Sequence, residues 1–299
     1  MKIPEIDFSS YDENDGRALA ALADALNEAL AGVGFLSLRN IGIDESLRDA
    51  VFAASKAFFA QPEAEKRKLG YSDAEDNFGY QGIREESLKP GSPPDLKEAL
   101  TLRDLNRFRG LDWPQPGFRD LLTAFNADCT AAAFRVMRVF AIGLEVDRDY
   151  FVRRHTGENV TMRLLHYPPL PPDGSEQLGA GPHTDYGLLT LLFQDMAGGL
   201  EVQDRDGGWQ PVTPKPGNVV INAGDLLERW TNKRYRSSLH RVRARPGGGH
   251  RYAVAFFVDP DSRTLVECLP SCVGRRNPPQ FGPTTAGEHI LAKIRATQA

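Results

Sequence analysis

Short apolar segments alternate with turn residues from residue 161 to about residue 266. Segments of this length, rich in β-branched and aromatic residues and bounded by Gly, Pro and Asp, are typical of strands joined by short connections. The run Asp206-Gly207-Gly208 adds a strong hairpin-turn signal. The pattern therefore predicts a double-sheet jelly roll, also called a double-stranded β-helix.

The chain before this stretch shows helical spacing of its apolar residues. Asp15 can cap a helix over 16–31, and Asp44 can cap a second helix that runs to about residue 60. A longer segment, 118–144, has the broad apolar face expected of a helix that backs the β core. We predict a fold that is mainly β with helices, in which a helical N-terminal region accompanies the jelly-roll core.

These parts are expected to form one continuous globular unit. Residues 1–155 form a helix-rich region that packs on the core, residues 156–270 form the jelly-roll core, and residues 271–299 form a C-terminal tail and helix. The segment 70–94 is rich in Gly, Ser, Pro and charge, which predicts a long connection with little regular structure. Loops of this length in compact chains are often functional.

Composition limits the kinds of partner and compartment. The 299 residues carry a formal net charge of −4, without the basic excess typical of nucleic-acid-binding proteins. No apolar run approaches the roughly 18 to 20 residues that span a bilayer, and the N-terminus is polar. The cysteines, Cys129, Cys268 and Cys272, are too scattered for a disulfide framework. We therefore expect a cytoplasmic protein without nucleic-acid or membrane partners, whose oligomeric state stays open.

A candidate metal site lies at the polar end of the strand-like run 181–195. His183 and Asp185 are two residues apart, so both side chains project to the same face of a strand. His240, in a second strand-like segment, is the best candidate for a third ligand. Two histidines and one carboxylate favour a mononuclear non-haem iron(II) site with open positions for cosubstrate and oxygen. The alternatives are a chance His-x-Asp pair and a zinc hydrolase, which lacks a glutamate placed as general base.

Arg251 begins a strongly apolar strand pattern, where a guanidinium is costly to bury without a partner. An anionic cosubstrate would supply that partner, because the planar fork of arginine matches a carboxylate. The alternative is an arginine at the start of a strand in solvent.

Several motifs together resemble the isopenicillin N synthase-like family of iron(II)- and 2-oxoglutarate-dependent dioxygenases, over nearly the whole chain. They are His183-Thr184-Asp185, Arg251-Tyr252-Ala253, and the segments 3–8, 34–43, 162–169, 207–225 and 235–242. The resemblance implies that His183, Asp185 and His240 hold iron(II). It also implies that Arg251 binds the far carboxylate of 2-oxoglutarate with help from Tyr167, and that Tyr80 lies near the substrate.

The implied reaction is oxidation of an unactivated C–H bond of a small molecule by O2, with release of succinate and CO2. The outcome is hydroxylation, or desaturation or ring closure, and ascorbate can serve as reductant. Ala253 replaces the serine of the family's Arg-x-Ser clamp. This change keeps open an iron oxidase of the same fold that uses no 2-oxoglutarate, of the isopenicillin N synthase or aminocyclopropane carboxylate oxidase type. A non-catalytic binding protein on the same scaffold is the alternative from another class.

The sequence also suggests where several further charged and polar side chains lie. The resemblance does not identify the substrate, but Arg84, Arg163 and Arg229 would favour a carboxylate-bearing one if they faced inward. Arg84, Lys89 and Lys97 are expected in solvent, and the alternative is that they steer anions. His166 should face away from Tyr167, because adjacent strand residues point to opposite faces. We expect three other histidines at the surface: His155, His250 and His289. Asn222 should form hydrogen bonds behind the metal site.

Overall fold

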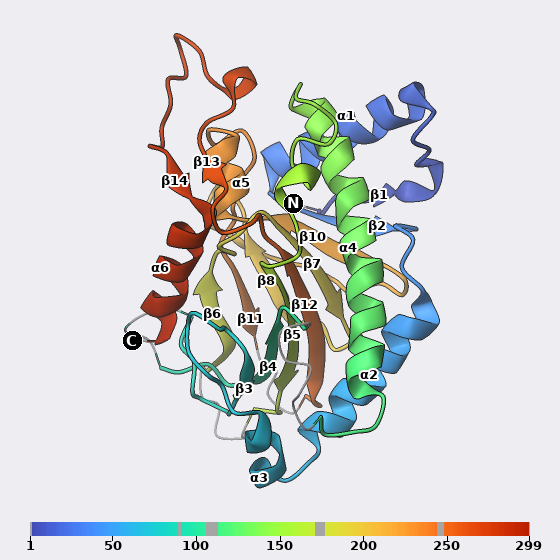
Figure 1. Ribbon diagram of the computed structural model, residues 1–299, viewed down its shortest axis with the longest axis vertical. Helices are drawn as coiled ribbons and strands as arrows, with labels where there is room; N and C mark the ends of the chain where they lie inside the picture. Colours follow the sequence, from blue (N-terminus) through green and yellow to red (C-terminus); the bar gives the residue numbers. More distant parts are fainter. Residues whose placement is uncertain are drawn as a thin grey trace.

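The computed structural model describes residues 2–88, 91, 93–105, 113–170, 177–243 and 248–298. An eight-stranded sheet and a four-stranded sheet enclose the central cavity, and the larger sheet carries helices on its outer side (Figure 1). Within both sheets the neighbouring strands are antiparallel, except that the first two strands pair in parallel. This arrangement is the predicted jelly roll.

The strands are given in their order across each sheet. The larger sheet contains β1 (Glu5–Asp7), β2 (Phe35–Arg39), β10 (Val219–Ala223), β7 (Leu189–Gln194), β12 (Arg251–Val258), β5 (Val160–Tyr167), β4 (Glu98–Arg103) and β3 (Gly79–Gln81). The smaller sheet contains β6 (Leu178–His183), β11 (His240–Arg243), β8 (Leu200–Gln203) and β9 (Trp209–Pro211). A separate pair joins β13 (Leu265–Val266) to β14 (Thr284–Thr285).

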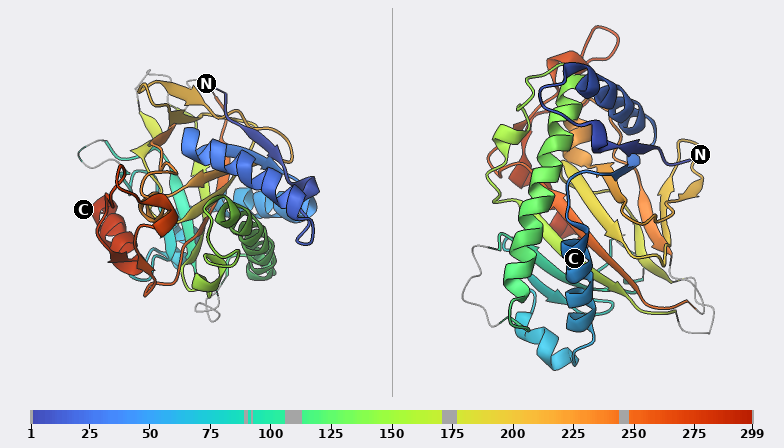
Figure 2. Two further views of the ribbon diagram at one scale, coloured as in Figure 1. Left: turned by 90° about the horizontal axis from the view of Figure 1, so that it is seen from above. Right: turned by 90° about the vertical axis from the view of Figure 1, so that its right-hand side faces the viewer.

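The helices near residues 16–31, 45–60 and 118–144 and at the C-terminal end agree closely with the sequence prediction, whereas the helix over 225–230 was not predicted. The helices are α1 (Gly16–Gly32), α2 (Glu45–Phe59), α3 (Glu63–Lys66), α4 (Phe118–Gly143), α5 (Asp225–Trp230) and α6 (Ala286–Gln298), with 3-10 turns at Phe8–Ser10, Arg67–Leu69, Val152–Arg154 and Pro270–Cys272. Asp15 and Asp44 cap α1 and α2 by accepting hydrogen bonds from first-turn amides. Helices α1, α2 and α4 lie on one side of the molecule and α6 on the other (Figures 1 and 2).

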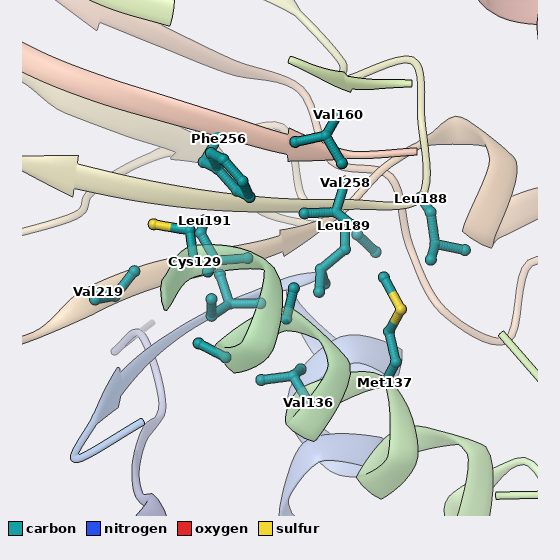
Figure 3. Packing of buried hydrophobic residues seen from close by; sticks show 14 of the residues in the cluster. Cys129, Val136, Met137, Val160, Leu188, Leu189, Leu191, Val219, Phe256 and Val258 are labelled. Carbon is teal, nitrogen blue, oxygen red and sulfur yellow. The ribbon is translucent and has the colours of Figure 1, made fainter. Parts of the chain in front are cut away.

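Strand β12 shows how alternation separates the core from the site. Val254, Phe256 and Val258 point toward the helices and are fully buried there, each contributing about 1.5–3 kcal/mol of burial free energy. In Figure 3, Phe256 and Val258 pack with Leu191 over α4. Ala253 and Ala255 point the other way, into the space between the two sheets. One face of the larger sheet therefore builds the core, and the other faces the cavity.

The segment before residue 155 contributes more strand than its sequence indicated. Strand β3 lies inside the stretch 70–94, which we expected to be irregular, and β4 follows it; both pair at the edge of the larger sheet. Strands from both sides of residue 155 thus share one sheet. Among the helices in the described ranges, none combines the length and apolarity needed to cross a membrane.

Candidate metal centre and cosubstrate pocket

Three side chains on or beside two neighbouring strands of the smaller sheet converge on one point. His183 ends β6, His240 begins β11, and the two residues are direct partners in the antiparallel register. Asp185 follows two residues after His183, and one ligand atom from each of the three lies within 4.8 Å of the others. The predicted set is therefore assembled by strand pairing.

Hydrogen bonds fix the orientation of each of these groups. The Oδ2 atom of Asp185 accepts from the Thr190 hydroxyl at 2.5 Å and from the Asn222 amide at 2.6 Å, while Oδ1 lies 3.6 Å from Nε2 of His240. Each imidazole places its Nδ1 against a backbone carbonyl, of Gly181 at 2.8 Å and of Ser238 at 3.1 Å. Because a carbonyl only accepts, Nδ1 carries the proton, and each Nε2 keeps its lone pair for a metal.

The electrostatics of the centre suit a metal cation. Burial, followed by the neighbouring His240, holds the pKa of His183 well below its usual range, so the imidazole is neutral. Neutral imidazole and carboxylate are the forms that bind metal. Two nitrogen donors and one carboxylate oxygen, without thiolate, match non-haem iron(II). The residues present therefore fit the group that the sequence implied.

A second polar feature lies at the other end of the inner face. Arg251, the first residue of β12, pairs with Tyr167, the last residue of β5, and its guanidinium carbon lies 4.6 Å from the centre of the tyrosine ring. Its Nε donates to the Gly198 carbonyl at 2.7 Å, and Nη2 donates to the Gln194 side chain at 3.0 Å. Nη1 of Arg251 and Nε2 of Gln194 are buried without a partner in the described chain.

These unpaired donors fit the binding of an anionic cosubstrate. A guanidinium only 6% exposed, with one terminal nitrogen unpaired, is costly unless a carboxylate binds it. Ala253 lies on the same inward face two residues further along β12, so the hydroxyl of the family's serine is missing beside the clamp. Gln194, which sequence reasoning missed, supplies an amide on that side; its spacing from Thr190 and Leu192 on β7 is the signal that places it inward.

The cavity connects the two ends, and it corrects one predicted site residue. Tyr80 does not line it: the ring packs in the helix-side core, and the hydroxyl donates to Glu98 at 2.5 Å. The next residue, Gln81, faces the cavity instead. Because side chains alternate along a strand, an expectation one residue out of register selects the wrong face.

Arg163 is the one of the three arginines that faces inward. It lines the cavity, but it is paired with Glu86. The exposed Arg84 donates to the side chain of Gln177, and Arg229 donates to the Gly282 carbonyl; neither arginine lines the cavity. Lys97, expected in solvent, is 3% exposed and lies in the cavity wall, while Lys89 is outside the described residues. That expectation for Lys97 was wrong, because its segment packs against the sheet.

The other histidines lie apart from the centre. His166 faces away from Tyr167 as predicted, and its ring bonds Glu98 at 2.7 Å and His250 at 2.8 Å. His250 is exposed. His155 was expected at the surface but is buried, with Nδ1 on the Phe151 carbonyl, and His289 is half-buried near Asp225. Asn222 hydrogen-bonds behind the site as expected.

Fold and site together define a non-haem metal oxygenase, and comparison with known proteins agrees. The 2OG-Fe(II) oxygenase superfamily matches residues 158–260, and the N-terminal family of non-haem dioxygenases in morphine synthesis matches residues 3–115. A 2-oxoglutarate-Fe(II) type oxidoreductase, hxnY of Emericella nidulans, is 34% identical over 96% of this chain and 88% of its own length.

Solved structures show the same likeness. A full-length Neurospora crassa protein in complex with α-KG and thymine superposes with a TM-score of 0.89 at 32% identity, covering 98% of this chain and 96% of that one. JOX2 in complex with 2OG, Fe and JA superposes with a TM-score of 0.83 at 28% identity, covering 98% and 85%.

The chain belongs to the 2OG-Fe(II) oxygenase superfamily. It is an iron(II)- and 2-oxoglutarate-dependent dioxygenase, whose cofactors are iron(II) and 2-oxoglutarate and whose oxidant is O2. The main prediction from the resemblance is confirmed. Solved relatives hold 2-oxoglutarate, so the oxidase that needs none has no support from the comparisons.

Proposed function

We propose that His183, Asp185 and His240 hold the iron(II), and that Arg251 and Tyr167 hold the far carboxylate of 2-oxoglutarate. The assignment rests on two groups along one cavity that lack binding partners in the described parts of the chain. At one end, two free Nε2 lone pairs and a carboxylate oxygen converge within 4.8 Å; at the other, a buried guanidinium has a nitrogen without a partner among the described residues. A divalent cation and a dicarboxylate would supply these partners.

When bound, iron(II) and 2-oxoglutarate supply the oxidising chemistry: O2, substrate C–H and 2-oxoglutarate give substrate C–OH, CO2 and succinate. The protein's own residues do the positioning. Thr190 and Asn222 hold one oxygen of Asp185, which leaves its other oxygen for the metal. Tyr167 and Gln194 hold Arg251 in place. The ends of the cosubstrate are thus fixed by two separate sets of contacts.

The C-terminal helix α6 lies on the side of the molecule opposite α4 (Figure 1). Ile290 and Ile294 of α6 line the cavity. An ion pair of 2.7 Å between Lys293 and Asp225 ties the helix to α5, and Arg295 pairs with Glu75. We propose that this apolar cover excludes water from the reacting centre.

The substrate in this proposal is a small molecule. Structures of the similar Neurospora crassa protein contain thymine and 5-formyluracil. Oxidation of a C–H bond in a ligand of this size is the reaction that the cavity supports best, whether it ends in hydroxylation, desaturation or ring closure.

Calorimetric binding of metal and of 2-oxoglutarate tests the residue roles. Asp185→Ala should abolish tight metal binding and, with it, binding of 2-oxoglutarate. Arg251→Gln should keep the metal but weaken 2-oxoglutarate, because the two sets of contacts are separate. Full metal binding by Asp185→Ala, or undiminished 2-oxoglutarate binding by Arg251→Gln, would contradict the assignment.

A further inference from the structure

We infer that the substrate is an uncharged small molecule bearing carbonyl or amide groups, held beside a buried network formed by Glu86, Arg163, Lys97 and Asp95. The inference rests on the proposed function, because Glu86, Lys97 and Arg163 line the same cavity. It reverses the simple expectation that an inward-facing arginine marks a carboxylate-bearing substrate.

Arg163 is already saturated by a carboxylate of the protein. Its Nη2 lies 2.9 Å from Oε2 of Glu86 and its Nη1 lies 3.3 Å from Oε1, so the two planar groups form a bidentate pair. The third nitrogen, Nε, donates to the Thr101 hydroxyl at 3.1 Å. The two charged side chains are only 14% and 11% exposed.

Lys97 and Asp95 complete the network. The lysine ammonium lies 3.0 Å from Glu86 and also pairs with Asp95; the side chains of Lys97 and Asp95 are each 3% exposed. Asp95 accepts in addition from the backbone amide of Gly181 at 2.8 Å. Although burial alone would raise it, Arg163 and Lys97 hold the pKa of Glu86 well below its usual range. Two cations and two carboxylates thus cancel inside the protein.

Among the described residues, three further charged side chains besides the metal-site carboxylate line the cavity: Arg251, Arg103 and Asp259. Arg103 and Asp259 carry opposite formal charges, so as a pair they add no net charge. Arg251 faces the cosubstrate end. Arg103 is half-buried, and its terminal nitrogens contact Asn159 and the Glu75 carbonyl. Asp259 is a buried carboxyl that accepts from the Leu188 amide at 2.9 Å, and burial raises its pKa to about 7.

A charged substrate would therefore disrupt this balance. A substrate carboxylate on Arg163 would have to displace Glu86 and leave a second buried anion beside it, and a substrate ammonium would face Arg163 and Lys97. Breaking a buried ion pair in either way is strongly unfavourable. An uncharged polar group enters without changing the net charge.

The open hydrogen-bonding groups specify what such a ligand carries. Gln81 accepts from Arg163 at 3.4 Å through its oxygen, and Asn77 accepts from the Tyr71 hydroxyl at 2.9 Å through its oxygen. Their amide nitrogens, and the Thr161 hydroxyl, line the cavity and have no partner among the described residues. The two amide nitrogens only donate, and the hydroxyl can donate as well as accept, so this set of groups suits carbonyl oxygens.

The network is placed to hold a substrate beside the cosubstrate. On β5, Arg163 precedes Tyr167 by four residues on the same face, a separation of roughly 13 Å at about 3.3 Å per residue. Arg163 lies opposite Ala255 across the strand pair, and Tyr167 lies opposite Arg251. Substrate and 2-oxoglutarate thus have separate rows of the inner face, and small residues such as Ala255 leave room between them.

The test is a competition of matched ligands for the full-length protein loaded with zinc(II) and 2-oxoglutarate. The set holds carboxylic acids with their primary amides and amines, such as benzoate, benzamide and benzylamine, together with thymine as a neutral imide. Ligand-observed NMR measures the dissociation constants, and binding of 2-oxoglutarate is measured in the same samples. Loss of 2-oxoglutarate binding would contradict the proposed function, whereas the ligand preference tests only the substrate class.

Neutral carbonyl compounds should bind at least about 100-fold more tightly than the matched acids and amines. Equal binding of the classes, preference for acids or amines, or no neutral ligand bound would each overturn the inference.

Glu86→Gln provides a second readout, because it removes one anion and leaves the network with a net positive charge. The ratio of acid to amide affinity should rise at least about tenfold. The matched control is Glu85→Gln, whose carboxylate contacts Arg67 and the Gly82 amide outside the cavity, and which should leave the ratio unchanged. If Glu86→Gln does not fold, Lys97→Gln should shift the preference toward amines. An unchanged ratio in a folded variant would contradict the charge argument.

Discussion

Replacing Asn222 with alanine is expected to weaken metal binding by about 10- to 100-fold, although the residue is not a ligand. The Asn222 amide donates to Oδ2 of Asp185 at 2.6 Å, and the Thr190 hydroxyl donates to the same atom at 2.5 Å. A hydrogen bond to a buried carboxylate contributes about 1.5–3 kcal/mol. Loss of one such bond, at about 1.4 kcal/mol per factor of ten, gives the stated range.

The assay is competition for iron(II) against a chelator under anaerobic conditions. Asn218→Ala is the matched control, because Asn218 directly precedes β10 and donates at 2.9 Å to the Ser37 hydroxyl, away from the centre. Thr190→Val should cost a similar amount, and the double variant should deviate from additivity, since both groups share one oxygen. If Asn222→Ala bound iron(II) as tightly as Asn218→Ala, the reasoning about the carboxylate's orientation would be refuted.

Three further predictions concern the cosubstrate clamp and the back of the sheet. Tyr167→Leu should weaken 2-oxoglutarate binding by about 3- to 30-fold in calorimetry, because it removes the ring that stacks on the Arg251 guanidinium. The control is Trp209→Leu, which removes a ring whose centre lies 4.1 Å from the Arg241 guanidinium carbon, outside the cavity, and it should not change 2-oxoglutarate binding. Ala253→Ser should tighten 2-oxoglutarate about fivefold by restoring one hydrogen bond, and unchanged or weaker binding would contradict this. Glu98→Gln should destabilise the protein by about 3–5 kcal/mol in urea unfolding at pH 7. Burial raises the pKa of Glu98, but the hydrogen bonds from His166, Lys66 and Tyr80 outweigh it and lower the pKa. This contribution to stability is therefore present above about pH 4.5 and is lost as the pH falls further. If the stability difference between the wild-type protein and Glu98→Gln grew on acidification, the prediction would be contradicted.

The candidate metal set was predictable because simple rules define it. The spacing of His183 and Asp185 places both on one face whatever the strand's partners are. Arg251 was predictable from the cost of burying a guanidinium in an apolar strand. The caps of α1 and α2 were equally local, since Asp15 and Asp44 bond amides two and three residues away.

The substrate side could not be predicted, because it depends on register between distant segments. Tyr80 and Gln81 differ by one position, and only the pairing of β3 with β4 decides which of them faces the cavity. Glu86, Lys97 and Arg163 come from separate segments of the chain, and their charges cancel only once these are packed together. His155 was misplaced for the same reason, since packing against Phe134 and the Phe151 carbonyl buries it.

The most direct test of the assignment is an anaerobic titration of the iron(II)-loaded protein with 2-oxoglutarate, followed by visible absorption. Chelation of iron(II) by the keto oxygen and adjacent carboxylate of 2-oxoglutarate gives a weak charge-transfer band. We predict a band that saturates at one equivalent per chain in the wild-type protein and is absent from Asp185→Ala. Stoichiometric iron without any band would contradict the assignment of this cavity as the 2-oxoglutarate site.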